Sequence, residues 1–208
     1  MIAFQKPVPP SKHASKSSDQ GCPPLSTIPW KPTKEQIVAA AGKTVRDVIA
    51  HDLRVLFCGI NPGLFTAAVG HHFARPGNRF WKALYEAGFT TRLFSPFEES
   101  ELLQSGYGVT NVVSRATATA DLLAKEEIIQ GGQRLKAKVR RYRPQILAIL
   151  GLGAYRLAFS QPKATVGRQE REIGDTVLWV LPNPSGLNAN YQQKDLARLF
   201  RELKAEVL

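Results

Sequence analysis

Cysteine is scarce in this chain of 208 residues, which contains only Cys22 and Cys58. Two thiols cannot build a disulfide framework, and they do not supply the four thiolates of an ordinary iron–sulfur cluster. Cys58 lies in an apolar stretch, where a free cysteine usually acts as a small buried hydrophobic residue. The fold must therefore rest on an ordinary hydrophobic core, and a chain of this length can bury one.

Long apolar runs are also missing. A membrane-spanning helix needs about 20 consecutive apolar residues, and no stretch of the sequence approaches that length. Residues 1–28 hold Lys, Ser and Pro in place of the continuous apolar segment of a secretory signal. We therefore expect no membrane partner and a cytoplasmic location, associated with the nucleoid if the source is bacterial.

Acidic residues are outnumbered, because 28 Lys and Arg face 17 Asp and Glu, which gives a net charge of +11. The isoelectric point is about 9.9. Such a surplus attracts polyanions, nucleic acid above all. The simpler alternative is a solvated basic surface that has no specific partner.

The chain divides into two parts by composition. Residues 1–28 are rich in Pro, Ser and Lys, which predicts a disordered basic tail that could tether the protein to phosphates. Residues 29–208 carry the periodic apolar pattern of a single folded domain, and a helix-capping signal stands at Thr33.

Within this domain, apolar strand patterns alternate with helical patterns. Strands are predicted at 53–60, 109–113, 145–151 and 176–182, and helices at 78–88, 97–105, 121–142, 153–159 and 190–206. This alternation predicts an α/β fold with three αβα layers and a mainly parallel central sheet. A turn at Gly174-Asp175 indicates an antiparallel hairpin at one edge.

Two loops of related chemistry follow predicted strands, Gly59–Gly63 (GINPG) and Asn183–Leu187 (NPSGL). Ligands of open α/β sheets bind outside the carboxyl ends of the strands, so we expect both loops to border one cleft. Pro62 stiffens the first loop, and the amide of Asn61 can orient a water molecule, although it cannot act as a strong base. The alternative is that Asn61 serves only the turn.

Leu187 stands in a polar setting and has two readings. It is either the first core residue of the last helix or an apolar wedge that enters stacked bases, as in proteins that kink duplex DNA. The wedge depends on a DNA partner.

The segment 70–81 (GHHFARPGNRFW) contributes an aromatic residue to a polar loop, since Phe73 could stack on a base. The helical spacing of the next apolar residues predicts that they belong to the core: Phe80, Trp81, Leu84 and Tyr85. Adjacent histidines without a neighbouring Cys or carboxylate set make a poor metal site, so His71 and His72 do not predict one.

Together, GINPG, GHHFARPGNRFW and LPNPSGLN resemble the three signature segments of the mismatch-specific uracil-DNA and thymine-DNA glycosylases, within the uracil-DNA glycosylase superfamily. The resemblance covers residues from about 53 to 205. It implies a monofunctional, monomeric enzyme of base excision repair without metal or other cofactor. Such an enzyme flips mispaired uracil (G:U, more weakly G:T or other damaged pyrimidines) out of double-stranded DNA and hydrolyses the N-glycosidic bond. An abasic-site endonuclease would take the product.

The resemblance also implies roles for individual residues. Asn61 would hold the attacking water, Phe73 would stack on the flipped base, and Leu187 would fill the gap left in the duplex. The backbone from Gly186 to Ala189 would contact the orphaned guanine. The implied substrate-binding residues are Gly59, Ile60, Thr66, His72, Phe73, Asn183 and Ser185, and the implied DNA-binding residues are Gly186, Leu187, Asn188 and Ala189.

The chain departs from related branches at three positions. Other branches of the superfamily carry a catalytic Asp in the first motif and a His in the last, where this chain has Asn61 and Asn183, so slow chemistry is expected. Asp121 is the candidate for a second catalytic residue, and its alternative role is a helix N-cap. Thr66 replaces a smaller residue of thymine-accepting members, which predicts that uracil is preferred to thymine.

Two rival functions remain at this point. A basic α/β protein could recognise distorted or mismatched DNA without cutting it. A nucleotide-binding enzyme is the weaker rival, because the chain lacks the G-x-G-x-x-G pattern and its acidic ribose partner.

Overall fold

A computed structural model describes residues 31–207 of the chain. The predicted tail at 1–28 lies outside these residues. The described part contains a five-stranded sheet in the order β2-β1-β3-β5-β4. The strands are β1 (Val55–Gly59), β2 (Tyr107–Asn111), β3 (Ile146–Leu150), β4 (Gly167–Ile173) and β5 (Thr176–Leu181).

Four of the strands run parallel, and only β4 pairs antiparallel with its neighbour β5. The predicted α/β fold and the hairpin at the sheet edge are thus confirmed. The chain leaves β1 for β2 on one side and later returns to β3 on the other, so β1 lies at a point where the direction of strand order changes. Crevices at such points are the usual ligand sites of open α/β sheets.

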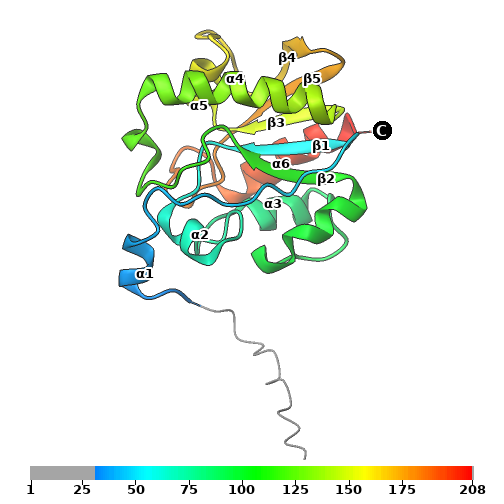
Figure 1. Cartoon of the computed structure of the whole chain (residues 1–208). Helices are drawn as coiled ribbons and strands as arrows, with labels where there is room; N and C mark the ends of the chain where they lie inside the picture. Colours follow the sequence, from blue (N-terminus) through cyan, green and yellow to red (C-terminus); the bar gives the residue numbers. More distant parts are fainter. Residues whose placement is uncertain (1–30, 208) are drawn as a thin grey trace, which may run out of the picture. The chain divides into compact units, whose positions relative to one another are not determined.

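The helical segments lie on both sides of the sheet (Figure 1). They are α1 (Lys34–Val38), α2 (Leu64–Val69), α3 (Phe80–Glu86), α4 (Lys125–Tyr142), α5 (Leu152–Ala158) and α6 (Gln193–Ala205), with 3₁₀ segments η1 (Pro96–Ser105) and η2 (Ala120–Leu122). No helix in the described range 31–207 is long and apolar enough to cross a bilayer.

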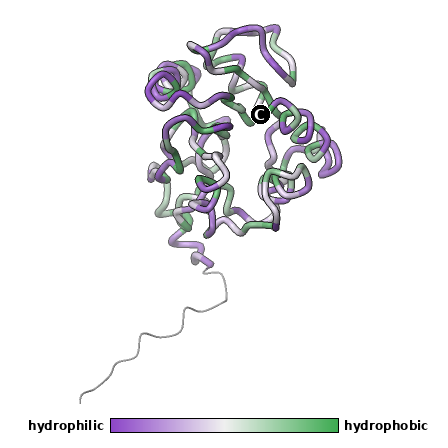
Figure 2. Tube along the Cα trace, turned by 90° about the vertical axis from the view of Figure 1, so that its right-hand side faces the viewer, coloured by the Kyte–Doolittle hydropathy of each residue, from purple (hydrophilic) through white to green (hydrophobic). Residues whose placement is uncertain are grey.

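Alternate residues of the strands serve two separate cores, as the two-residue period of a strand requires. Val55 and Phe57 pack with α3, η1 and α6, whereas Leu56 and Cys58 pack with α4 and α5. Burial raises the pKa of the Cys58 thiol, which makes it an unreactive core residue, as expected. In Figure 2, a view turned by 90° about the vertical axis, hydrophilic and hydrophobic residues are intermixed along the Cα trace.

The secondary structure corrects several expectations. The capping box at Thr33 is present, but its helix is short. The helix expected at 121–142 begins only at Lys125, and its N-cap is Ala124, so the N-cap role of Asp121 is wrong. Helix α2 after the GINPG turn was not predicted. The prediction that Tyr85 belongs to the core is wrong: it is 45% exposed, because it lies outside the buried stripe of α3 that Phe80, Ala83 and Leu84 form.

Candidate active site

A cavity of about 380 Å³ opens at the carboxyl ends of the strands. Four strand ends contribute to its lining, through Gly59, Asn111, Leu150 and the loop that begins after β5 at Asn183. Its volume lies within the usual range for small-molecule sites, roughly 300–1,000 Å³. The two loops predicted to share a cleft do share it.

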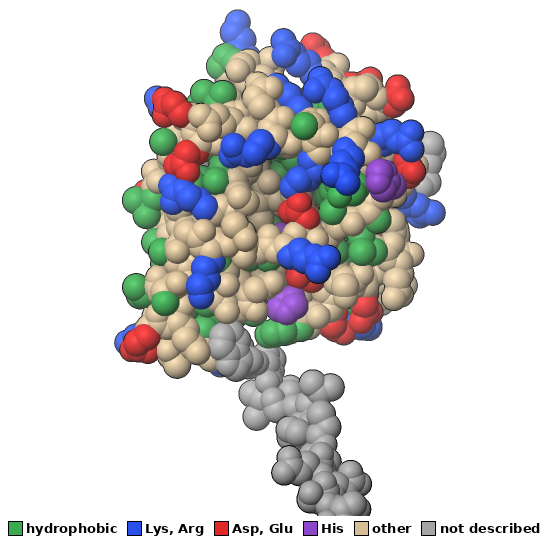
Figure 3. Space-filling view, in the orientation of Figure 1, with side chains coloured by type: hydrophobic (Ala, Val, Ile, Leu, Met, Phe, Trp, Pro, Cys, Tyr) green, Lys and Arg blue, Asp and Glu red, His purple; other side chains and the backbone are tan. Residues whose placement is uncertain are grey.

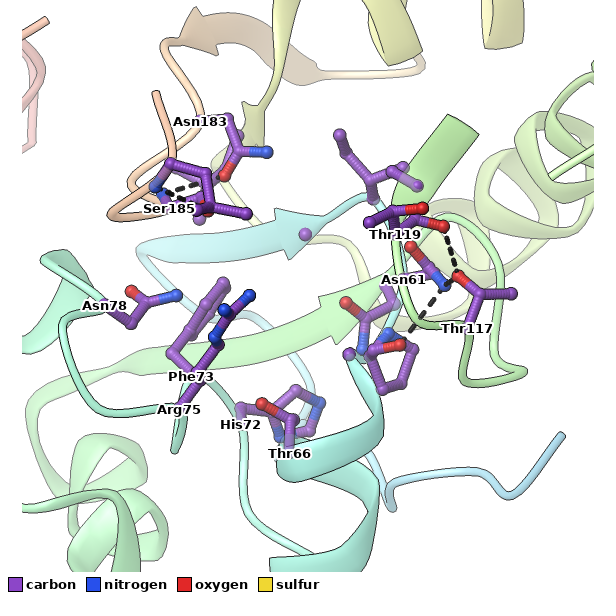
Figure 4. A pocket seen from close by; sticks show the side chains of 18 of the residues that line it. Asn61, Thr66, His72, Phe73, Arg75, Asn78, Thr117, Thr119, Asn183 and Ser185 are labelled. Atoms are coloured by element: carbon purple, nitrogen blue, oxygen red, sulfur yellow. Dashed lines mark hydrogen bonds between the residues drawn. The ribbon is translucent and has the colours of Figure 1, made fainter. Parts of the chain in front are cut away.

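Most of the residues that the sequence singled out line this cavity, and two do not. Those in the lining are Gly59, Ile60, Asn61, Thr66, His72, Phe73, Asp121, Asn183, Ser185, Leu187 and Asn188. Gly186 and Ala189 belong to the same loop but lie outside the lining, and both are exposed. Figure 4 shows Asn61 with Thr117 on one side of the cavity, Asn183 with Ser185 on another, and His72 beside Thr66 on a third.

The amide of Asn61 is held by three acceptors around its nitrogen. Nδ2 donates to the hydroxyl of Thr117 at 2.7 Å, to the carbonyl of Arg115 at 3.1 Å and to the carbonyl of Pro62 at 3.2 Å. Within residues 31–207, no group donates to Oδ1 of Asn61. The amide orientation is therefore fixed, and its acceptor oxygen is the atom left for a water molecule.

This arrangement depends on the segment that follows β2. The amide nitrogens of Val112 and Thr117 donate to the carbonyls of Gly59 and Pro62, at 2.9 and 3.2 Å. The segment 112–117 therefore runs alongside the GINPG turn and brings Thr117 and Arg115 to Asn61. Sequence reasoning missed both residues, because their role depends on pairing between segments more than 50 residues apart.

Phe73 combines a strained backbone with a fixed ring. Its φ is +54°, a conformation that costs a bulky residue about 1–3 kcal/mol and tends to persist at functional sites. One face of the ring packs on Phe80, with ring centroids 4.1 Å apart and planes 30° from parallel. The ring is thereby fixed at the cavity wall, where a planar base can stack on it.

Gly59 is required by the crowding of this wall. A Cβ at position 59 would come within 2.5 Å of Oδ1 of Asn111 and 3.4 Å of the Phe73 ring. Asn111, at the end of β2, is a further polar residue in the cavity that sequence reasoning missed, because the strand was predicted two residues too late, at 109–113, with Asn111 in its interior.

The loop 183–191 is tied together by its own polar groups and by Arg79. Oδ1 of Asn183 accepts from the backbone of Ser185 at 3.0 Å, and Oγ of Ser185 accepts from the backbone of Leu187 at 3.3 Å. The Arg79 guanidinium donates to four carbonyls of this loop: those of Pro184, Ser185, Asn188 and Tyr191.

Leu187 is 69% exposed in the middle of this loop, five residues before helix α6 is capped at Gln192. The reading of Leu187 as the first core residue of the last helix is therefore wrong. An exposed Leu that lines a polar cavity fits the other reading, an apolar group that contacts a partner.

Asp121 lies in η2, is exposed, and lines the same cavity as Asn61. Among the described residues it makes no side-chain hydrogen bond. A solvated carboxylate at the rim can approach a bound molecule, so the N-cap correction leaves the catalytic hypothesis for Asp121 standing as a prediction.

The described surface carries many basic side chains, and Arg75 is the one that lines the cavity. Figure 3 shows Lys and Arg side chains spread over the face seen in Figure 1, including the region that α4 crosses. Helix α4 carries six of them: Lys125, Arg134, Lys136, Lys138, Arg140 and Arg141. Such a surface attracts a polyanion.

Comparison with known proteins agrees with this geometry. A model of the family described as the Uracil DNA glycosylase superfamily matches residues 46–204. Among solved structures, the chain is similar to the solution NMR structure of a candidate uracil DNA glycosylase from Methanosarcina acetivorans. The TM-score is 0.54 and the identity 16%, over 78% of this chain and 98% of that chain. At this identity the structural likeness shows a shared fold.

Proposed function

Because this chain belongs to the uracil DNA glycosylase superfamily, we propose that it is a monofunctional, monomeric glycosylase acting on uracil mispaired with guanine in duplex DNA. Superfamily membership implies an N-glycosylase that acts on DNA; the preference for a mismatch is the part we add. The product would be an abasic site, which a downstream endonuclease of base excision repair would process.

The observation that carries the proposal is the fixed amide of Asn61. Its three hydrogen bonds leave Oδ1 as an acceptor facing a cavity that is bordered by the Phe73 ring. A water held by Oδ1 would lie in the same cavity as a base stacked on Phe73, which is the proximity that hydrolysis of the sugar–base bond requires. Polar groups on the facing loop, at Asn183 and Ser185, can meet the polar edge of the base.

The preference for a mismatch is supported by the loop that carries Leu187. An exposed apolar side chain fits the space that a flipped nucleotide leaves in a duplex, and the clamped backbone around it can approach the opposite base. A single-stranded substrate offers neither the space nor the opposite base.

Cleavage of end-labelled DNA tests the proposal. Duplexes with one G:U, G:T or A:U pair, and the single strand, are incubated with the protein and broken at abasic sites by alkali. We expect breaks at G:U that disappear with Asn61→Ala while the affinity for the duplex is retained. Tight binding without breaks in any DNA would instead establish the rival function, recognition of distorted DNA.

The same assay decides the role of Asp121. Asp121→Asn keeps the size of the side chain, and Asp52→Asn is a matched control because Asp52 is exposed and outside the cavity lining. A general base is worth about 10²–10⁴-fold in rate, so a loss of that size only in Asp121→Asn would assign it. Equal rates for both variants would leave water activation to Asn61.

A further inference from the structure

The carboxylate of Glu99 binds two neighbouring histidines, of which His72 lines the cavity. Oε1 is 3.0 Å from Nδ1 of His71, and Oε2 is 3.0 Å from Nδ1 of His72. Oε2 also accepts from the backbone nitrogen of His72 at 2.7 Å. Glu99 comes from η1, and only 7% of it is exposed.

The charge state of Glu99 determines which ring nitrogens carry hydrogen. Burial raises the pKa of this carboxyl, but the hydrogen bonds from the side chain and backbone of His72 outweigh burial, and the pKa is lowered. An ionised carboxylate can only accept hydrogen bonds. Nδ1 must therefore be the donor in both His71 and His72.

The opposite nitrogen of His72 faces a different environment. His72 is 1% exposed, lines the cavity, and its Nε2 has no hydrogen-bond partner within residues 31–207. A buried nitrogen without a partner is costly unless a ligand supplies one. In a neutral imidazole that carries its hydrogen on Nδ1, Nε2 holds a lone pair and acts as an acceptor.

We propose that Glu99 is a positioning residue, which fixes the tautomer of His72 so that Nε2 accepts a hydrogen bond from an N–H group on the edge of the flipped pyrimidine. The inference rests on the proposed function and adds to it a specificity device. Uracil offers this group at N3. A pyrimidine without an N–H on the edge that faces His72 leaves Nε2 buried and unpaired.

Two substitutions of Glu99 separate this role from a merely structural one. In Glu99→Gln the amide oxygen can take the place of Oε2, where it accepts both bonds from His72. The amide nitrogen then faces His71, whose Nδ1 must become an acceptor. The variant should thus change the tautomer of His71 and leave that of His72 intact. Glu99→Ala removes the acceptor for both rings and frees His72 to place its hydrogen on Nε2.

Imidazole ¹⁵N shifts of the full-length protein read the tautomers directly, because protonated and unprotonated ring nitrogens differ widely. We expect hydrogen on Nδ1 of His72 in wild type and in Glu99→Gln, and on Nε2 in Glu99→Ala. Hydrogen on Nε2 of His72 in wild type would overturn the proposal, as would an unchanged Nδ1–H tautomer in Glu99→Ala.

Single-turnover excision tests the base-reading step, with duplexes that carry uracil or N3-methyluracil opposite guanine. Wild type and Glu99→Gln should prefer uracil, and the preference should fall by about tenfold in Glu99→Ala, the value of one hydrogen bond of about 1.4 kcal/mol. His71→Asn, which changes a residue outside the cavity lining, should keep it. An equal preference in Glu99→Ala and wild type would overturn the inference alone, whereas no excision of uracil by wild type would overturn the proposed function.

Discussion

The hydroxyl of Thr117 accepts a hydrogen bond from Nδ2 of Asn61 at 2.7 Å and donates its own hydrogen to the carbonyl of Thr119 at 2.7 Å. Because its hydrogen is committed to Thr119, the hydroxyl can only accept from Asn61. The amide of Asn61 must then point its nitrogen toward Thr117 and its oxygen away. The orientation of the proposed catalytic amide is therefore set by a residue 56 positions along the chain.

Removing the hydroxyl of Thr117 should lower the rate of excision strongly and the stability of the fold only slightly. In Thr117→Val the amide of Asn61 loses its shortest hydrogen bond, and a misaligned water should lower the single-turnover rate at G:U by roughly 10–100-fold. Thr117→Ser keeps the hydroxyl and should stay within about threefold of wild type. Rates are measured with enzyme in excess over DNA. Equal rates in the Val and Ser variants would contradict a positioning role for the hydroxyl.

The conformation of the loop 183–191 should depend on Arg79. Its guanidinium donates to four carbonyls of the loop 184–191, which a single ammonium group cannot reproduce. We expect Arg79→Lys to lower the rate at G:U by about tenfold, the effect of one or two lost charge-assisted hydrogen bonds. Arg92→Lys is the control, since Arg92 pairs with carboxylates on the exposed surface outside the cavity lining.

A double variant distinguishes this action through the loop from a direct contact of Arg79 with DNA. Arg79 can be replaced in a protein that already lacks the Leu187 side chain. If Arg79 acts by holding Leu187 in place, Arg79→Lys should then have little further effect on the rate, because the effects of substitutions at two coupled residues do not add. Additive losses in the double variant would show instead that the two residues contact DNA independently.

The layers of the fold could be predicted from the sequence, because apolar residues recur at different spacings in strands and in helices. Val55 and Phe57 alternate with Leu56 and Cys58 between the two cores, which is the pattern of a strand buried on both faces. The start of α4 did not follow, since Asp121 carries the usual N-cap side chain and the structure uses Ala124 with the carboxylate of Glu127. There the carboxylate of Glu127 accepts from the backbone of Ala124 and also pairs with Arg115, which lies outside the helix and is not visible in the local sequence.

The candidate site could be predicted only where its residues lie in short motifs. Asn61 and Asn183 are visible in loops that follow strands, Phe73 is visible in the polar segment 70–81, and all three line the cavity. Thr117 and Glu99 were not visible, because each acts on a residue more than 25 positions away through contacts that only the folded chain creates. Side chains that orient other side chains leave no local pattern.

Thr66 should set the preference for uracil over thymine, as the sequence predicts. It is buried, lies in α2 beside His72, and lines the cavity (Figure 4), so we expect its side chain to crowd the methyl group of a bound thymine. One methyl group in a pocket is worth roughly 10–200-fold in discrimination. Thr66→Ala should therefore raise excision at G:T by about tenfold and leave G:U nearly unchanged. Single-turnover rates of both substrates measure this ratio, and an unchanged ratio would exclude crowding by Thr66.

The ion pair between Arg115 and Glu127 should make the free energy of unfolding depend on pH in the acidic range. The bidentate bond from Arg115, helped by the backbone of Ala124, lowers the pKa of Glu127 from 4.5 to about 2. A carboxyl whose pKa is depressed on folding stabilises the fold above its unfolded pKa, and this contribution disappears as the pH falls toward the folded value.

Urea unfolding at a series of pH values, for wild type and Glu127→Gln, measures this dependence. The difference in free energy of unfolding between them should be constant above a pH of about 5 and shrink progressively toward a pH of about 2. Glu126→Gln is the matched control, because Glu126 occupies the same first turn of α4 and forms no ion pair with a described residue. A difference that does not change with pH would contradict the prediction, because it would mean that neither Arg115 nor the cap hydrogen bond from Ala124 measurably favours the ionised form of Glu127.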